Sequence, residues 1–216
     1  MISILLATYN GEKYIKDSIN SIINQDYKEW ELLVGFNGTY DSSKNIVSEI
    51  KDDRIKIFDY KEEKGKAKTL NKLIKESKYD LCAIQDDDDI WSEKKLSEQI
   101  NYFDKFDVVG TFIKYIDPSN QSIGEPSLSI SHQDIKSRSL SGDNQTANSS
   151  AVFKKSAAID IGLWNEEIDG IEDFDFWIRL LKKGYLFHNI PKYLVFHRIH
   201  QESNFNTKTH NINSIL

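Results

Sequence analysis

Four consecutive aspartates, Asp86 to Asp89, follow the short apolar run at residues 81–84 after a single glutamine, Gln85. An apolar run this short, bounded by turn-forming residues, is typical of a buried strand. A block of carboxylates at one strand end is costly to keep ionised unless positive charge lies among them. Mg²⁺ and Mn²⁺ prefer oxygen ligands and often bind one or two carboxylates together with a substrate's phosphates. The block therefore predicts a metal site at the carboxyl edge of a sheet, where open α/β folds bind their ligands.

Part of the block has a simpler interpretation, because aspartate is a good helix N-cap and favours the first helical turn. A helix is predicted beyond the block from apolar residues at helical spacing: Leu96, Ile100 and Phe103. Capping explains one or two of the carboxylates, and Asp89 or Ser92 is the expected cap. Asp86 and Asp88 remain the strongest site residues, and both interpretations stay open for Asp87.

The first half of the sequence alternates short apolar runs with amphipathic stretches. The runs lie at residues 2–7, 30–36, 55–58 and 81–84, and isoleucines and leucines at helical spacing separate them. This rhythm predicts βαβ units and a parallel sheet. Right-handed crossovers then bring every strand's carboxyl end to one edge. That edge would also carry the glycine-containing turns after the first two strands, which suit phosphate-binding helix starts and predict a nucleotide cleft.

The second half breaks this rhythm. Strands are predicted at residues 108–116, 150–153, 186–190 and 193–199, and one helix at 171–183, which Gly184 would end. Residues 117–131 read as a loop, residues 133–148 are polar and poorly periodic, and 201–216 form a polar tail. The sequence thus predicts one α/β domain over 1–216, with a mostly parallel central sheet flanked by helices and a mixed second half.

Composition excludes several classes of protein. The 216 residues carry a net charge of −6, with a pI of about 5.4, which leaves no general basic footprint for nucleic acid. The lone cysteine, Cys82, allows no internal disulfide and reads as an inert core residue in a reducing compartment. No apolar stretch approaches the ~20 residues of a membrane span. The first seven residues lack a basic leader and read as a strand, so a cytoplasmic enzyme is expected.

Five segments, in order along the chain, resemble the family 2 glycosyltransferases with the GT-A fold, a Rossmann-like fold of nucleotide-diphospho-sugar transferases. Residues 4–15 (ILLATYNGEKYI) resemble the first strand and turn, and residues 21–33 the following helix and strand. Residues 85–91 (QDDDDIW), with Lys95 and Leu96 beyond, are similar to the metal-binding Asp-x-Asp motif (DXD). Residues 170–180 (GIEDFDFWIRL) resemble the catalytic acidic pair, and residues 197–200 (HRIH) the C-terminal Arg-x-His segment.

The resemblance implies an inverting, metal-dependent, hexosyltransferase-type enzyme that uses Mn²⁺ or Mg²⁺. Its donor would be a nucleotide-diphosphate sugar, for which UDP is expected, and its acceptor a glycan in surface-polysaccharide synthesis. Residues 1–116 would bind the donor, and 117–200 would hold the acceptor and the catalytic groups. The enzyme would have no nucleic-acid partner and no membrane span, although a peripheral membrane association is allowed.

The resemblance also implies residue roles. Asp88 is the favoured metal ligand, joined by Asp86 and His200. The donor-binding set comprises Ala7, Thr8, Tyr9, Asn10, Glu12, Asn37, Lys68, Asp86, Asp87 and Arg198. Lys66 would also touch the donor phosphates, although a solvated lysine run explains both lysines equally well. A surface histidine remains the alternative for His200, and His197 would face the other way in an extended segment.

A general base must lie within hydrogen-bond reach of the acceptor hydroxyl. Asp173 is favoured for this role, with Glu172 close behind, although either carboxylate could instead cap the helix that begins there. Phe174 and Trp177 would form an apolar wall that raises a carboxylate pKa. Asp175 points elsewhere on the helix and is expected to be structural.

One departure from the family pattern concerns the base of the nucleotide. The family has an acidic pair after the second strand, where this chain has Phe36 and Asn37. Asn37 can accept a hydrogen bond from a uracil N–H, but it can also donate one, so the base stays open. Alternatives to transfer are a sugar nucleotidyltransferase, an aspartyl phosphatase, and a nucleotide-sugar-binding protein with weak or lost transferase activity.

Overall fold

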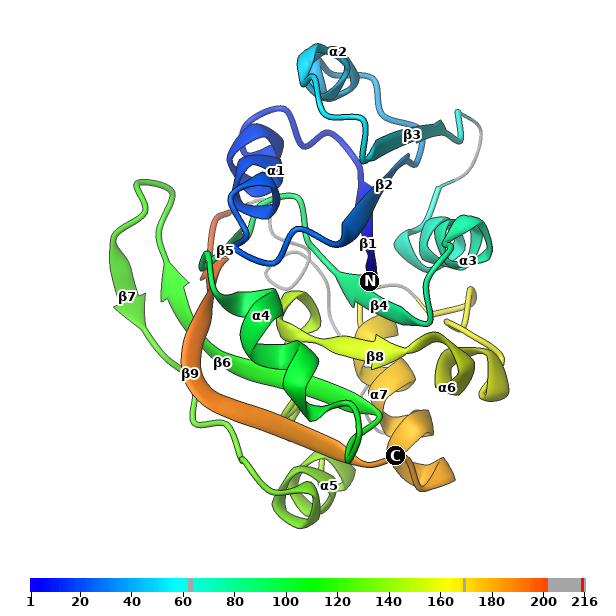
Figure 1. Cartoon of the computed structure of the whole chain (residues 1–216), viewed down its shortest axis with the longest axis vertical. Helices are drawn as coiled ribbons and strands as arrows, with labels where there is room; N and C mark the ends of the chain where they lie inside the picture. The colour runs from blue at the N-terminus through cyan, green and yellow to red at the C-terminus, as the bar shows by residue number, and fades with distance from the viewer. Residues whose placement is uncertain (62–63, 169, 202–214, 216) are drawn as a thin grey trace.

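The computed structural model describes residues 1–61, 64–168, 170–201 and 215. A mixed nine-stranded sheet forms its centre, and helices cover both faces (Figure 1). The strand order is β3-β2-β1-β4-β8-β6-β9-β5, with β7 paired to β6. The predicted α/β domain with a central sheet between helices is therefore present.

The elements follow one another with short connections. The strands are β1 (Ile2–Thr8), β2 (Trp30–Phe36), β3 (Ile55–Asp59), β4 (Leu81–Ile84), β5 (Ile90–Trp91), β6 (Val108–Ile116), β7 (Ser122–Gly124), β8 (Val152–Lys154) and β9 (Phe187–Arg198). The α-helices are α1 (Ile15–Ile23), α2 (Ser43–Glu49), α3 (Lys66–Glu76), α4 (Lys95–Gln99), α5 (His132–Leu140), α6 (Lys155–Asp160) and α7 (Glu172–Lys183). Two 3₁₀ turns, η1 (Ile100–Tyr102) and η2 (Asn148–Ser150), complete the described elements.

The first four strands form the predicted parallel half of the sheet. β1 pairs in parallel with β2 and with β4, and β2 pairs in parallel with β3. Alternate β1 side chains enter two cores: Ile4 packs with α1, α2 and α4, whereas Leu5 packs with α3, α6 and α7. A parallel sheet covered on both faces requires near-continuous apolar strands, which is the pattern that the sequence carries.

The sheet reverses its direction of growth between β1 and β4. From β1 the chain crosses to β2 on one side, and β4 later adds on the other side of β1. In open α/β sheets a crevice forms at such a switch point, outside the carboxyl ends of the two strands. Thr8 ends β1 there, and the aspartate block leaves β4 at the same edge. The topology therefore places the predicted site residues at the position where this fold class binds ligands.

The second half of the sheet is mixed, as predicted. β8 runs antiparallel to both β4 and β6, whereas β6 and β9 run parallel. The two strands predicted at residues 186–190 and 193–199 are one strand, β9. Its register against β6 passes from Ile190 directly to Tyr193, so Pro191 and Lys192 form a bulge. Proline cannot donate to a ladder and is confined to such places, which is why the sequence resembled two strands.

Three more predictions were wrong or incomplete. The presumed loop 117–131 contains β7, and the poorly periodic stretch contains α5, whose Ser131 hydroxyl accepts from the backbone of Asp134 as an N-cap. The expected caps are also wrong: α4 begins after Lys94, and neither Asp89 nor Ser92 caps it through a side chain. The tail 201–216 lies, apart from Gln201 and Ile215, outside the described residues.

Candidate active site

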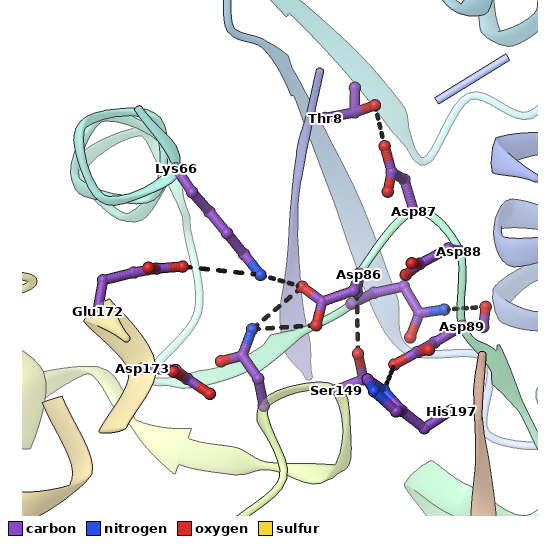
Figure 2. A network of polar contacts seen from close by, with 12 residues as sticks. Thr8, Lys66, Asp86, Asp87, Asp88, Asp89, Ser149, Glu172, Asp173 and His197 are labelled. Atoms are coloured by element: carbon purple, nitrogen blue, oxygen red, sulfur yellow. Dashed lines mark hydrogen bonds and ion pairs between the residues drawn. The ribbon is translucent and has the colours of Figure 1, made fainter. Parts of the chain in front are cut away.

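The aspartate block leaves β4 as a tight turn that other elements hold by its backbone (Figure 2). The amide of Asp86 donates to Ser149 Oγ at 3.1 Å, and Ser18 Oγ donates to the Asp86 carbonyl at 3.0 Å. The Gln85 side chain donates to Ser18 Oγ and to the Asp89 carbonyl, each at 2.7 Å. These contacts from α1 and η2 fix the direction in which each carboxylate points.

The carboxylate of Asp86 connects the block to the start of α7 through Lys66. Lys66 Nζ, from the start of α3, lies 2.5 Å from Asp86 Oδ1 and 4.0 Å from Glu172 Oε1 (Figure 2). Asn148 Nδ2 donates to both Asp86 oxygens, at 3.1 and 3.3 Å. Burial acts to raise the pKa of Asp86, but the Lys66 ammonium outweighs it and holds the pKa below its ordinary value. Burial likewise opposes the charge on Lys66, yet Asp86 and Glu172 raise its pKa.

Asp87 turns toward the end of β1. Its Oδ2 accepts a short hydrogen bond from Thr8 Oγ1 (Figure 2). A Cβ on Gly11 would collide with this carboxylate and with Thr8 Oγ1, so a larger residue there would have to displace their contact. Burial, with the Asp88 and Asp86 charges, raises the pKa of Asp87 to about 7. The negative charge at this edge is thus only partly compensated by the protein.

Asp88 meets the C-terminal segment. Its Oδ2 lies 3.0 Å from His200 Nε2, and its carbonyl accepts from Arg198 Nε at 2.9 Å. The Arg198 guanidinium also stacks over the ring of Tyr14, 4.4 Å from its centroid, and donates to the Asp117 carbonyl. The structure therefore brings His200 and Arg198 to the aspartate block, as the resemblance implied, and His200 is not a free surface histidine.

Asp89 is fully buried and has a structural partner that sequence reasoning missed. Its carboxylate accepts from the Arg198 amide at 2.9 Å and contacts His197 Nδ1 at 3.0 Å (Figure 2). Burial opposes the imidazolium, but Asp89 raises the pKa of His197 to about 9. The pairing of Ile90 with Phe196 in the β5–β9 ladder puts Asp89 opposite His197. The expectation that His197 faces away is therefore wrong.

The acidic pair stands at the start of α7, whose apolar face anchors it. Phe176 and Trp177 pack in the core with α3 and α6, and this packing holds α7 in place. Glu172 accepts from the Gly170 amide at 2.7 Å, and the Phe174 amide contacts Asp173 Oδ1 at 2.8 Å. Burial and the neighbouring Glu172 charge raise the pKa of Asp173 to about 7.

Asp175 takes no part in this cluster. Its carboxylate binds Arg179 one turn later, at 2.8 Å. The same guanidinium donates to the carbonyls of Ile161 and Leu163 and so ties α7 to the loop before it. The expectation of a structural role for Asp175 agrees with these contacts.

The turns after β1 and β2 are locked to each other. Asn10, with a left-handed φ of 56°, accepts from the Tyr40 amide at 3.1 Å. Glu12 accepts from the Ser42 amide at 2.9 Å, and its own amide donates to Asp41 at 2.9 Å. The side chains of Asn10 and Glu12 therefore hold the turn, and both residues remain predicted donor-binding residues.

The remaining predicted donor-binding residues differ in exposure. Ala7 packs in the core, so only its backbone faces the edge, whereas Tyr9 is 46% exposed. Asn37 is buried, and its Oδ1 has no partner among the described residues. Lys68 is exposed, and Lys66 occupies the place near the carboxylates instead. Trp91, which ends the motif of residues 85–91, is buried and donates to the Ser149 carbonyl.

The side chains at this edge suit a divalent cation whose remaining coordinating atoms come from a bound ligand. No group of three or more His, Cys, Asp or Glu residues within the described ranges is arranged to hold a metal ion by itself. Asp88 and His200 nevertheless offer a carboxylate oxygen and an imidazole nitrogen side by side. Asp86 precedes Asp88 by two residues in the same turn. Mg²⁺ is commonly bound by one or two carboxylates plus substrate phosphates. Burial, and then the Asp88 charge, raise the pKa of Asp87, so a cation bound there would favour its ionised form.

The described helices include none that is both long enough and apolar enough to cross a bilayer. Cys82 is a free, buried cysteine, and burial raises the pKa of its thiol to about 12. Its expected place in the core is confirmed.

Comparisons with known proteins agree with this arrangement. The family described as "Glycosyl transferase family 2" matches residues 3–162. An Escherichia coli protein named "O-antigen biosynthesis glycosyltransferase WbnJ" is 30% identical over 216 residues, which cover 94% of this chain and 81% of that protein. Its name places WbnJ in polysaccharide biosynthesis, the setting that the sequence predicted.

Two solved structures share the fold. TarS of S. aureus in complex with UDP-GlcNAc has a TM-score of 0.80 at 18% identity, over 97% of this chain and 61% of that chain. The mannosyltransferase PcManGT from Pyrobaculum calidifontis, in complex with GDP-Man and Mn²⁺, has a TM-score of 0.72 at 17% identity, over 94% and 58%. The present chain thus spans about three fifths of each. The predicted GT-A fold is confirmed.

Proposed function

Because this chain belongs to glycosyl transferase family 2, we propose that it moves a sugar from a UDP-sugar to a hydroxyl of a glycan or surface-polysaccharide acceptor, with inversion and with a bound divalent cation. The glycosyltransferase class itself is confirmed by the family match. That match favours transfer over the nucleotidyltransferase and phosphatase alternatives.

The observation that carries the proposal is the convergence of two acidic groups that lie about ninety residues apart. Lys66 contacts both Asp86 of the aspartate block and Glu172 of the acidic pair. A transferase needs a site for the leaving diphosphate beside a base for the incoming hydroxyl, and reacting atoms must be held close together. The contacts of Lys66 hold the groups proposed for these two tasks next to each other.

Each half of the site has a proposed task. Residues 1–116 bind the donor, with Thr8, Asn37 and the aspartate block at the switch point. Asp88 and His200, with Asp86, would hold the cation. When bound, the cation would supply charge stabilisation for the departing diphosphate. Arg198, whose Nη2 is buried without a partner among the described residues, supplies a fixed positive charge beside Asp88.

Residues 117–200 would hold the acceptor and the base. Asp173 is the proposed base because a group that takes a proton works best when its pKa lies near the operating pH. Its pKa of about 7 satisfies this condition, and Glu172 remains the alternative. A single displacement at the anomeric carbon, with Asp173 taking the acceptor proton, inverts the configuration. A cytoplasmic location is also proposed, because Cys82 is a reduced thiol.

Calorimetric titration of the whole chain tests the donor and metal roles. UDP, UDP-glucose, UDP-GlcNAc and GDP-mannose would be titrated with and without Mn²⁺. We expect a UDP-sugar to bind only with Mn²⁺, and Asp88→Ala to abolish this binding. Asp143→Ala, at an exposed aspartate paired with Arg138, is the matched control and should bind as the wild type does.

Two results would contradict parts of the proposal. If Asp88→Ala binds as tightly as the wild type in Mn²⁺, Asp88 is not the metal ligand. If the wild type binds a donor but neither transfers nor hydrolyses it with any glycan acceptor, the chain is instead a nucleotide-sugar-binding protein that has lost its activity.

A further inference from the structure

Asn148 begins the turn η2, which is braced from the side opposite the site. Trp91 Nε1 donates to the Ser149 carbonyl at 2.9 Å, and Gln99 Nε2 donates to the Ser150 carbonyl at 2.8 Å. All three residues of the turn are buried. The backbone of the turn that carries Asn148 is therefore held by contacts from β5 and α4.

The orientation of the Asn148 amide is fixed as well. Its Nδ2 faces both oxygens of Asp86. An ionised carboxylate can only accept, so the amide nitrogen must face it and Oδ1 must point away. Asn148 is 7% exposed, and Oδ1 has no hydrogen-bond partner among the described residues. A buried carbonyl oxygen without a partner is uncommon in native proteins and calls for an explanation.

The surroundings suggest what this oxygen is for. Asp86 Oδ1 receives both Asn148 Nδ2 and Lys66 Nζ, and Lys66 extends toward Glu172. Asn148 thus lies within the link between the aspartate block and the acidic pair. In the proposed function, the sugar being transferred must lie between the aspartate block, which binds the diphosphate, and the acidic pair, which supplies the base.

We propose that Asn148 recognises the sugar of the donor: its Nδ2 holds Asp86, and its Oδ1 accepts a hydrogen bond from a sugar hydroxyl. This inference rests on the proposed function and adds a specificity residue to it. Because Oδ1 is enclosed, a neighbour must move when the sugar enters. Lys66 shares the Asp86 oxygen with Asn148, and its flexible side chain is 23% exposed, so it is the neighbour that we expect to move.

A merely structural role makes a different prediction. If Asn148 only positions Asp86, its loss should weaken the binding of a nucleotide and of the matching nucleotide sugar by the same factor. If Oδ1 binds the sugar, only the extra affinity contributed by the sugar should fall. The ratio of the two dissociation constants therefore separates the two roles without any measurement of activity.

The experiment measures this ratio with Mn²⁺ present for UDP against UDP-glucose and UDP-GlcNAc, and for GDP against GDP-mannose. For the sugar that wild type prefers over its bare nucleotide, Asn148→Ala should reduce the preference about three- to tenfold, the effect of one hydrogen bond. Ser149→Ala is the matched control, because it removes the acceptor of the Asp86 amide but leaves Asn148 in place. It should weaken nucleotide and nucleotide sugar equally.

Three outcomes overturn the inference: an unchanged preference for the sugar nucleotide in Asn148→Ala, a fall of this preference in Ser149→Ala as large as that in Asn148→Ala, or a wild type that binds the sugar nucleotide no better than the bare nucleotide. If Asn148→Ala does not fold, Asn148→Ser replaces it with the same expectation. The short serine hydroxyl cannot reach both Asp86 and the sugar. A wild type that binds no nucleotide with Mn²⁺ defeats the proposed function itself, and the two failures are thereby distinguished.

Discussion

The two halves of this sheet are held together by different interactions. From β1 to β4, apolar side chains fill both faces of the parallel half. From β6 to β9, buried amides make the connections: Asn189 Nδ2 donates to the carbonyls of Ser129 and Gln145, each at 2.8 Å. The difference shows that apolar burial dominates the parallel half, whereas the mixed half adds hydrogen bonds between distant segments to its apolar contacts.

If the two halves have separate roles, Asp173→Asn should affect transfer but not donor binding, and its effect is the largest that we expect. This change keeps the shape of the side chain but removes the base, so we expect transfer to fall about 10²–10⁴-fold. Donor affinity, which we propose to depend on the other half, should stay unchanged. Steady-state kinetics and titration of the donor check both parts. Asp134→Asn, in the first turn of α5, is the matched control. If Asp173→Asn transfers the sugar as fast as the wild type does, Asp173 is not the base.

The pH profile gives the same test without a substitution. Asp173 must be ionised to accept a proton, and its pKa of about 7 exceeds the ordinary aspartate value. Below that pH the carboxyl holds a proton, so kcat/KM should fall as pH drops through about 7, and it should level off above. A profile that stays flat from pH 6 to pH 8 would argue against Asp173, since kcat/KM reports groups of the free enzyme.

A core truncation tests the apolar half. Leu33 is fully buried in β2, and Leu33→Ala should lower the free energy of unfolding by about 2–5 kcal/mol. Leu186→Ala, at a leucine that is 42% exposed, is the matched control and should cost far less. Chemical denaturation measures both. Similar losses in the two variants would mean that the apolar core does not dominate this half.

The polar half should respond to the loss of one amide. Asn189→Ala leaves two carbonyls without their donor, and we expect a loss of about 1–3 kcal/mol in the free energy of unfolding. The exposed Asn101, which donates to the Ser97 carbonyl at 2.8 Å, provides the control, and Asn101→Ala should have little effect. If Asn189→Ala matches its control, buried hydrogen bonds are not what holds the second half.

Lys95 gives an effect with a characteristic pH dependence. Its side-chain nitrogen is fully buried over the Trp91 ring and beside Gln99, and burial lowers its pKa well below the ordinary value. Between the lowered pKa of the folded chain and the pKa of the unfolded lysine, near 10.4, the unfolded chain binds more protons than the folded chain, so stability rises with pH across that interval. Lys95→Met should be more stable than the wild type at pH 7.

The advantage of Lys95→Met should shrink by up to about 1.4 kcal/mol for each pH unit as pH rises toward 10. Urea denaturation between pH 7 and pH 10 measures this. Lys192→Met, at an exposed lysine paired with Glu98, should show a constant difference from the wild type. A constant difference for Lys95→Met as well would mean that Lys95 keeps its proton in the folded protein.

The success of sequence reasoning follows the same division. The four strands of the first half and the carboxyl edge with its aspartates could be predicted, because burial on both faces leaves continuous apolar runs. α5 was missed although Ser131 and Asp134 carry the spacing of a capping box, a signal that could have identified it. The role of His197 had no such signal, since it depends on the register of β5 against β9.

The sequence by itself determined the α/β class, the parallel half and the family, because apolar periodicity and short motifs are local properties of a chain. Only the tertiary structure decided how the aspartates divide their tasks: Asp86 to Lys66 and Asn148, Asp87 to Thr8, Asp88 to His200, and Asp89 to His197. Four identical side chains in a row cannot be told apart in a sequence. Partners that arrive from distant segments set the burial and the charge around each one, and these decide what each carboxylate does.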